Sequence, residues 1–510
     1  MELIKEKEVY IERLISENER VAVEEDIIVP DVKPDILKVL QVDARAYVTD
    51  RGLLSGSMYA KGKLYVNILY IPDSEEDGIG CIKTAFDFRS KLENPALSQD
   101  MSLIVSCDVS RADFSAINSR KLSVRATVSL GYEVYGEKEL DVPSSRDDGD
   151  FECIYKTVNC ERISAVEECE FSVRDSAEIP SGKKAAAEIL KTDVRIYDKE
   201  IKALQSKLIL KGCLSVCVLY LTDEGKTDYF EAELPFTEVF DVYELDETDI
   251  CSLKLAIGEV TAELCQDNDG DMRILNIEGL INVSLCAHRC SEINLISDCY
   301  CPGKKTKITA NEVSLTGFIG NKSAQNTVKE IITPDSKLPG IVKIYNSVAE
   351  PEITRAQAVD GGAEVEGRLK VYILYITDNS KCPVYSFKKE IPFKFSYEFE
   401  GASGGMQCRA DIEAENNSCT MSPGGDIEFK CILKQEVSVS ENKRINFIEE
   451  IETDNLEQSG DIVICFAKQG DTLWGIAKKY AVKASDIKEL NGLESDNISA
   501  GQRIVIPFCR

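Results

Sequence analysis

The sequence GKLYVNILYIPD at residues 62–73 occurs twice more in the chain, as GCLSVCVLYLTD at 212–223 and GRLKVYILYITD at 367–378. Six of the twelve positions are identical in all three copies. Each copy alternates apolar side chains along one face and becomes apolar on both faces near its end, which is typical of a β-strand entering a core. The repeat therefore predicts three copies of one β domain, each built around this strand.

The flanking sequence is repeated as well. A second strand is predicted around residues 85–88, 234–236 and 391–393, and alternating runs follow at the three segments 122–130, 274–285 and 427–437. A proline opens an apolar stretch ahead of each core strand, at 29–40, 179–190 and 333–344, which favours a helical turn before the sheet. Because the copies lie about 150 residues apart, we expect whole antiparallel sandwich-like or barrel-like domains rather than solenoid repeats. Each core strand has a tyrosine at the same position, namely Tyr70, Tyr220 and Tyr375. It lies where both faces of the strand are apolar, so we expect it in the core rather than at an interface.

The last fifty residues follow a different pattern. A β-branched strand after Asp461 is followed by Gly470, which allows a tight turn, and by Asp471 and Thr472, which can cap a helix. The helix has apolar residues at helical spacing, and a second helix at 484–490 ends at Asn491-Gly492. A closing strand fits 503–506. The order is strand–helix–helix–strand, a small βααβ domain.

These patterns divide the chain into four domains. We expect three β domains at 1–150, 151–305 and 306–455, and the small βααβ domain at 461–507. Linkers are predicted at the three segments 143–150, 302–307 and 453–460. Residues 1–28 fit either a strand pair or a helix, and the sequence leaves both open. The predicted fold class is mainly β.

Composition limits the function. The chain of 510 residues has a formal net charge of −29, which makes nucleic acid a poor partner. We find no signal-peptide core at its start and no apolar run of membrane-spanning length, so a cytoplasmic protein without a transmembrane segment is expected. Nineteen cysteines, an odd number at scattered positions, favour reduced thiols over a disulfide framework.

No catalytic constellation is visible, so we expect no enzyme and no cofactor. His288 is the single histidine, and nothing near it resembles a nucleophile elbow. The segment CAHRC at 286–290, with Cys299 and Cys301 following, has zinc-ligand chemistry. However, ordinary reduced cysteines on strands are the better interpretation, and no metal site is predicted. Asp267–Asp271 is read as a hairpin turn in preference to a calcium loop.

Residues 461–507, with GDTLWGIAKKY at 470–480 followed by the spaced pairs Asp-Ile, Leu-Asn, Gly-Gln and Ile-Pro, resemble a LysM domain. The resemblance implies a non-catalytic binder, usually of N-acetylglucosamine glycans such as peptidoglycan. It also implies a groove between the loop from the first strand to the first helix and the loop from the second helix to the closing strand. Leu473, Ile476 and Ile487 are expected in the core, and Trp474 fits packing and contact equally well. The implied groove and rim consist of Gly470, Asp471, Thr472, Leu473, Trp474, Lys478, Asn491, Gly492, Leu493 and Ile498.

Three copies of the repeat followed by one LysM-like domain resemble the SipL family of spore coat morphogenesis proteins of spore-forming clostridia. That family has three SPOCS (DUF3794) domains and a C-terminal LysM domain. The resemblance implies a coat-assembly scaffold in the mother-cell cytosol at the outer forespore membrane. It also implies that the LysM domain binds the coat-basement ATPase, stage IV sporulation protein A, with other coat proteins as further candidates.

The contact residues expected for that partner are Asp471, Thr472, Trp474, Lys478 and Asn491. A peptidoglycan or cortex-binding protein is the alternative, and a cell-wall hydrolase is a third possibility that no visible pair of carboxylates supports. The sequence does not determine the oligomeric state or the packing of the β domains.

Overall fold

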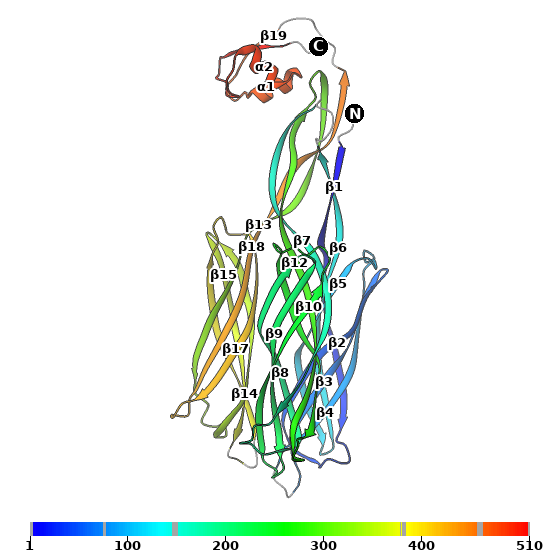
Figure 1. The fold of residues 1–510 in the computed structure, drawn as a ribbon, viewed down its shortest axis with the longest axis vertical. Coiled ribbons are helices and arrows are strands. Elements are labelled where there is room, and N and C mark those ends of the chain that lie inside the picture. The colour runs from blue at the N-terminus through cyan, green and yellow to red at the C-terminus, as the bar shows by residue number, and fades with distance from the viewer. Residues whose placement is uncertain are drawn as a thin grey trace.

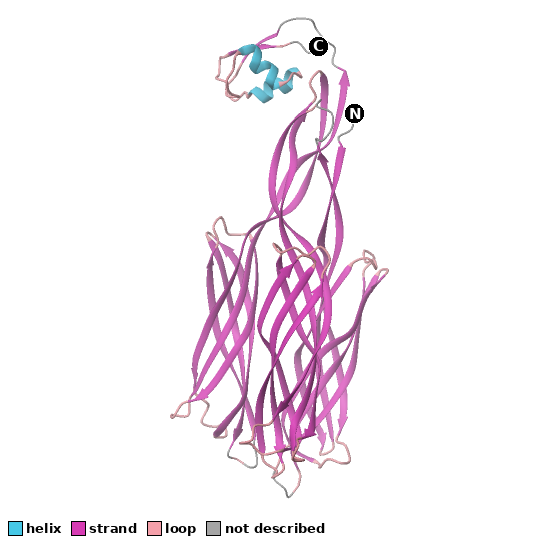
Figure 2. Ribbon diagram, viewed as in Figure 1, coloured by secondary structure: helices cyan, strands magenta, loops and turns pink. Residues whose placement is uncertain are grey.

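The computed structural model describes residues 4–74, 78–144, 151–377, 379, 384–455 and 463–507. Within these ranges the chain is mainly strand, and the two helices both belong to the C-terminal module (Figure 2). Unit 1 comprises β1 (Ile4–Ile28), β2 (Ile36–Leu54), β3 (Ser57–Pro72), β4 (Gly80–Glu93), β5 (Ser102–Asn118) and β6 (Lys121–Ser144). Unit 2 comprises β7 (Glu152–Glu178), β8 (Ala186–Leu204), β9 (Lys207–Thr222), β10 (Thr227–Asp241), β11 (Ile250–Gln266) and β12 (Met272–Tyr300). Unit 3 comprises β13 (Lys304–Ile332), β14 (Ile341–Val359), β15 (Gly362–Thr377), β16 (Val384–Glu398), β17 (Gln407–Met421) and β18 (Ile427–Asn455).

Every unit has the same antiparallel topology. In unit 1, one sheet has the order β2-β3-β4 and the second pairs β1 and β5 with β6, and the corresponding strands of units 2 and 3 pair in the same way. The second sheets of units 1 and 2 join through a single β1–β7 pairing, Ile11 opposite Ile163. The repeated sequence forms the central strands β3, β9 and β15, and apolar residues of both sheets pack between them. The predicted fold class is thus confirmed, whereas the domain limits stay a prediction.

The repeated tyrosine is a core residue, as predicted. Tyr70, Tyr220 and Tyr375 are each fully buried. Each donates its hydroxyl hydrogen bond to a backbone carbonyl in the segment before β2, β8 or β14, at 3.2–3.3 Å. The tyrosine therefore fixes the entry of the chain into the first sheet while satisfying its own buried hydroxyl group.

The segments opened by proline differ in part from the prediction. In unit 1 the amide of Lys33 donates a hydrogen bond to the Pro30 carbonyl at 2.9 Å. This bond closes a β-turn, where the sequence predicted a helical turn. The remainder of each segment is strand, because β2, β8 and β14 begin at Ile36, Ala186 and Ile341. Their apolar side chains pack across the first sheet, and this tertiary contact outweighs the local preference after proline.

Other boundaries differ as well. Residues 4–28 form the single strand β1, paired with β6 along its whole length, so neither a strand pair nor a helix is present. The predicted linker at 302–307 is a short turn, since β13 begins at Lys304. Asp378 and residues 145–150 and 456–460 lie outside the described residues.

The strands β1, β6, β7, β12, β13 and β18 are much longer than the others and continue past the units as a stalk (Figure 1). Apolar side chains from units 2 and 3 meet inside this stalk, among them Leu295 from β12 and Phe447 from β18. The C-terminal module lies at the stalk tip, away from the three units (Figure 1). The stalk therefore sets the position of the module.

The three units surround a shared centre. Leu69, Leu219 and Leu374 occupy the same position of the three repeats, and all belong to one buried cluster. Equivalent residues of the repeats thus face one another, as expected for units arranged about a common axis.

The first residue of the repeat must be glycine for steric reasons. A Cβ on Gly62 or Gly367 would lie 2.2 or 2.4 Å from a backbone carbonyl oxygen, whereas on Gly212 it would meet only the Phe236 ring, at 2.6 Å. We expect Gly62→Ala and Gly367→Ala each to lower the free energy of unfolding by about 2 kcal/mol, and Gly212→Ala by less, because a ring can move and a strand backbone cannot. Urea unfolding measures this. Gly78→Ala, which meets nothing within 4 Å, is the control.

Candidate functional site

The C-terminal module is a compact βααβ unit. The strands β19 (Val463–Phe466) and β20 (Arg503–Ile506) pair antiparallel, and α1 (Leu473–Tyr480) and α2 (Ala484–Asn491) lie between them in sequence. Leu473, Ile476 and Ile487 are buried, which confirms their predicted place in the core. Leu493 and Ile498 pack against the same cluster from the second loop.

The first loop of the predicted groove is closed by its own side chains. Gly470 has a φ of +93°, and the Asp471 carboxylate accepts a hydrogen bond from the Lys468 amide at 2.8 Å. Thr472 caps α1, and its hydroxyl oxygen accepts from the Gly475 amide at 3.0 Å. All three residues remain exposed. Asp471 and Thr472 therefore shape the loop and still present surface to solvent.

The second loop depends on Asn491. Its side-chain amide donates to the carbonyls of Ile487 and Val505 at 2.8 and 2.7 Å, and its oxygen accepts from the Val505 amide at 2.7 Å. Asn491 therefore joins α2 to β20, and most of its hydrogen-bonding capacity is used within the module. Gly492 follows in the left-handed conformation, with φ of +63°, and is exposed.

Two predicted partner residues contact the stalk of the same chain. The Trp474 indole donates to the Asp298 carboxylate at 2.7 Å, and the Lys478 ammonium group forms an ion pair with that carboxylate. Tyr300 packs edge-on against Trp474 with ring centroids 4.9 Å apart, and its hydroxyl donates to the Val482 carbonyl at 2.9 Å. We call these contacts of Asp298 and Tyr300 with the module the stalk dock. Of the two roles that the sequence left open for Trp474, the structure shows packing within the chain, and contact with a partner stays a prediction.

Electrostatics supports the dock. Burial raises the pKa of the Asp298 carboxyl group, but hydrogen bonds from Lys478 and Trp474 outweigh burial and lower it. The carboxylate is thus held ionised, as charge-assisted hydrogen bonds require. Sequence reasoning missed Asp298 and Tyr300, because they end a strand 176 residues before Trp474 and belong to no motif of the module.

Trp474 is the one tryptophan of the chain, so its fluorescence reports the stalk dock directly. We expect Asp298→Ala to shift the emission to longer wavelength and to increase quenching by acrylamide, because the indole loses its hydrogen-bond acceptor and its cover. The control is Glu489→Ala, an exposed change on α2. Unchanged emission in Asp298→Ala would mean that the module does not rest on β12 in solution.

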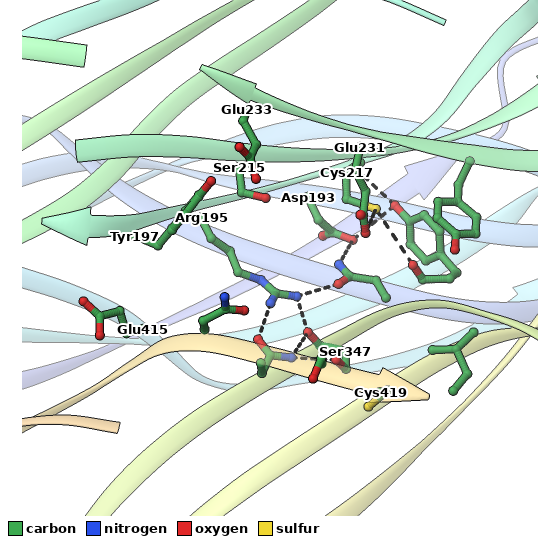
Figure 3. A pocket seen from close by; sticks show the side chains of 17 residues that line it. Asp193, Arg195, Tyr197, Ser215, Cys217, Glu231, Glu233, Ser347, Glu415 and Cys419 are labelled. Atoms are coloured by element: carbon green, nitrogen blue, oxygen red, sulfur yellow. Dashed lines mark hydrogen bonds between the residues drawn. The ribbon is translucent and has the colours of Figure 1, made fainter. Parts of the chain in front are cut away.

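A second candidate site is the polar cavity between units 2 and 3, of about 390 Å³ (Figure 3). Arg195 of β8 crosses it and donates to the side-chain oxygens of Asn346 and Asn417, both at 2.6 Å, and to the Ser347 carbonyl. The carboxylates of Glu231, Glu233 and Glu415 are among the other groups that line it. Since the Arg195 guanidinium is bonded to protein groups of unit 3, the cavity is best described as a polar junction between two units.

The segment with zinc-ligand chemistry lies in the second half of β12. Cys286 and His288 lie on β12, where Cys286 Sγ is 3.4 Å from His288 Nε2, and His288 Nδ1 is 3.2 Å from a Glu161 oxygen. Among the described residues, no group of three or more His, Cys, Asp or Glu side chains is arranged to hold a metal ion. Cys286 and Cys290 of this segment, and Cys299 after it, are free thiols. In the same part of the chain, no helix is long and apolar enough to cross a membrane.

The comparisons with known proteins agree with this arrangement. The family model described as SipL, SPOCS domain matches residues 35–117, 185–265 and 340–422, and the LysM domain model matches residues 467–507. Each SPOCS match begins just before β2, β8 or β14 and stops at the end of β5, β11 or β17, so it contains none of the long stalk strands. Both are families of non-catalytic binding domains.

One curated relative matches the C-terminal module. The cell wall-binding protein YocH of Bacillus subtilis (strain 168) is 51% identical over 39 residues, which are 8% of this chain and 14% of that protein. The chain thus spans about a seventh of the length of this relative. No solved structure matches.

Proposed function

We propose that this chain, which has the SipL architecture of three SPOCS domains followed by a LysM domain, is a non-enzymatic scaffold of spore coat assembly. Its placement in the mother-cell cytosol, at the forespore surface, is part of this proposal. The observation that carries the proposal is the position of the LysM module at the tip of a long stalk, with its loops at 470–472 and 492 exposed. Such a shape presents a binding module at a distance from the body.

The partner that we propose is a protein, the coat-basement ATPase called stage IV sporulation protein A. The exposed surface of the module supports a protein contact: Ile464 and Phe466 of β19 are 50% and 63% exposed. Large apolar side chains exposed together favour association with another protein. Asp471 and Thr472 are the predicted contacts that stay accessible, while Trp474 and Lys478 are engaged by Asp298.

A second candidate ligand is peptidoglycan. It is favoured by the 51% identity between the module and part of a cell wall-binding protein. The same groove residues would then contact sugar, with Thr472 and Asn491 as polar contacts.

The two candidates are separated by binding of the full chain to purified stage IV sporulation protein A and, separately, to purified sacculi. The scaffold proposal expects capture of the ATPase, no sedimentation with sacculi, and loss of capture when residues 459–510 are removed. Asp471→Ala with Thr472→Ala should weaken capture, and Glu489→Ala should not. Sedimentation with sacculi without capture of the ATPase would contradict the scaffold proposal and support the alternative.

A further inference from the structure

Two cysteines face each other at the stalk tip. Cys153 of β7 and Cys299 of β12 are paired residues in the antiparallel register, and the next pair, Glu152 with Tyr300, is the last of this ladder. Among the strand registers of the described residues, this is the one place where two cysteines stand opposite each other. Both are free thiols.

Their position satisfies the geometry of a disulfide. Residues directly opposite in an antiparallel pair have Cα atoms about 4.5–5.5 Å apart and side chains on the same face. Disulfides join residues whose Cα atoms are about 4.4–6.8 Å apart. A bond between Cys153 and Cys299 therefore needs no displacement of either strand. The register shift between Ile296 and Asp298 increases the local twist next to the pair.

The surroundings give the two thiols different roles. Cys299 is fully buried, in a cluster with Ile296, Ile448 and Ile451, whereas Cys153 lies at the margin of that cluster and is half-buried. A hydrogen bond from the Cys299 thiol lowers the pKa of Cys153, more than burial raises it, and the same bond raises the pKa of Cys299. Cys153 is the group that an outside reagent reaches first, and it has the greater thiolate character.

The pair is also next to the stalk dock. Cys299 stands between Asp298, which binds Trp474 and Lys478, and Tyr300, which packs against Trp474. Ends of strands open locally more readily than their centres. The last residues of β12 therefore control how firmly the module is held.

We propose that Cys153 and Cys299 form a reversible disulfide that fastens the end of β12 to β7 and so locks the LysM module on the stalk. The oxidant is a low-molecular-weight disulfide. The Cys153 thiolate attacks one of its sulfur atoms, which forms a mixed disulfide and releases one small thiol. Cys299 then loses its proton and attacks the Cys153 sulfur, releasing the second small thiol. Two protein thiols are oxidised and one small disulfide is reduced to two thiols.

The experiment treats the full chain with glutathione disulfide under native conditions and digests it after blocking the remaining thiols. We expect a linked peptide containing Cys153 and Cys299, whose mass is lower by two hydrogen atoms than the summed mass of the two free peptides. Dithiothreitol should convert it back to the two free peptides. Amide exchange at 298–300 and 474–482 should slow by about tenfold on oxidation. A linked peptide with unchanged exchange would overturn the locking effect.

Single variants test the order of attack. Cys299→Ser should stop at a stable glutathione adduct on Cys153, whereas Cys153→Ser should leave Cys299 unmodified because it is buried. Cys290→Ser is the matched control, because Cys290 is an exposed cysteine on β12 that lies opposite Glu161 and not opposite a cysteine. This variant should form the same linked peptide as the original chain. Oxidation of other cysteines without a Cys153–Cys299 peptide would overturn the proposal.

Discussion

Replacing Asp193 by alanine should lower the free energy of unfolding by about 3–5 kcal/mol, the usual cost of removing one partner from a buried ion pair. Asp193 is only 5% exposed. Its carboxylate accepts from Arg45 of unit 1 at 3.0 Å and from Asn346 of unit 3 at 3.2 Å, and it is 3.3 Å from the buried ammonium group of Lys191. One side chain of unit 2 thus joins all three units.

The charges of this network depend on each other. Burial raises the pKa of Asp193, but Lys191 and Arg45 outweigh burial and lower it. Burial lowers the pKa of Lys191, but Asp193 and Asp43 outweigh burial and raise it. Without Asp193, the ammonium group of Lys191 stays buried with Asp43 alone, 2.7 Å away. The expected loss is therefore larger than the loss of a hydrogen bond.

Urea unfolding followed by far-ultraviolet circular dichroism tests this prediction. We expect Asp193→Ala to unfold at lower urea concentration and over more than one transition, because the units are no longer joined at the centre. Asp50→Ala is the control. Asp50 of β2 forms an exposed ion pair with Lys61 of β3, so the variant should unfold as the original chain does. Equal midpoints for the two variants would show that the central network does not stabilise the fold.

Some of this junction is visible in the sequence. The pattern Asp-x-Arg occurs in units 1 and 2, at Asp43–Arg45 and Asp193–Arg195. The same strand positions of unit 3 hold Val348 and Glu350, so the pattern is absent there. Periodicity places both side chains on one face of a strand. It does not say which unit that face meets, because the arrangement about a common axis depends on contacts far apart in the chain.

The fold was more predictable than the stalk. The alternating, β-branched core strands identify a buried antiparallel sheet, since burial on one or both faces determines which side chains a strand tolerates. The stalk strands, such as the 29-residue β12 and β18, are partly exposed and interrupted by register shifts. Each shift moves the apolar positions to the other face, so the alternation that identifies a strand is lost there.

The candidate site shows the same limit. The LysM pattern located Leu473 and Thr472 correctly, since core positions and helix caps follow from local rules. These rules could not identify the partner of Trp474, because Asp298 lies on β12, far away in the sequence, and an isolated aspartate near a strand end belongs to no motif.

His288 should titrate far above the usual range of histidine. Burial lowers the pKa of its imidazole, but hydrogen bonds with Cys286 and Glu161 outweigh burial and raise it to about 9. His288 is the single histidine of the chain, so selective ¹³C labelling of histidine gives one signal to follow by nuclear magnetic resonance. We expect a midpoint near pH 9, and a midpoint near the ordinary value of 6.5 would show that the imidazole is not held by these two groups.

The same shift makes stability depend on pH. A group whose pKa is higher in the folded chain than in the unfolded one contributes stability that is complete below about pH 6.5 and is lost as the pH rises through about 9. The contribution of His288 amounts to up to about 3 kcal/mol. We therefore expect the difference in unfolding free energy between the original chain and His288→Gln to shrink between pH 6.5 and pH 10. A difference that stays constant over this range would exclude a charged His288 as a stabilising group of the β7–β12 pair.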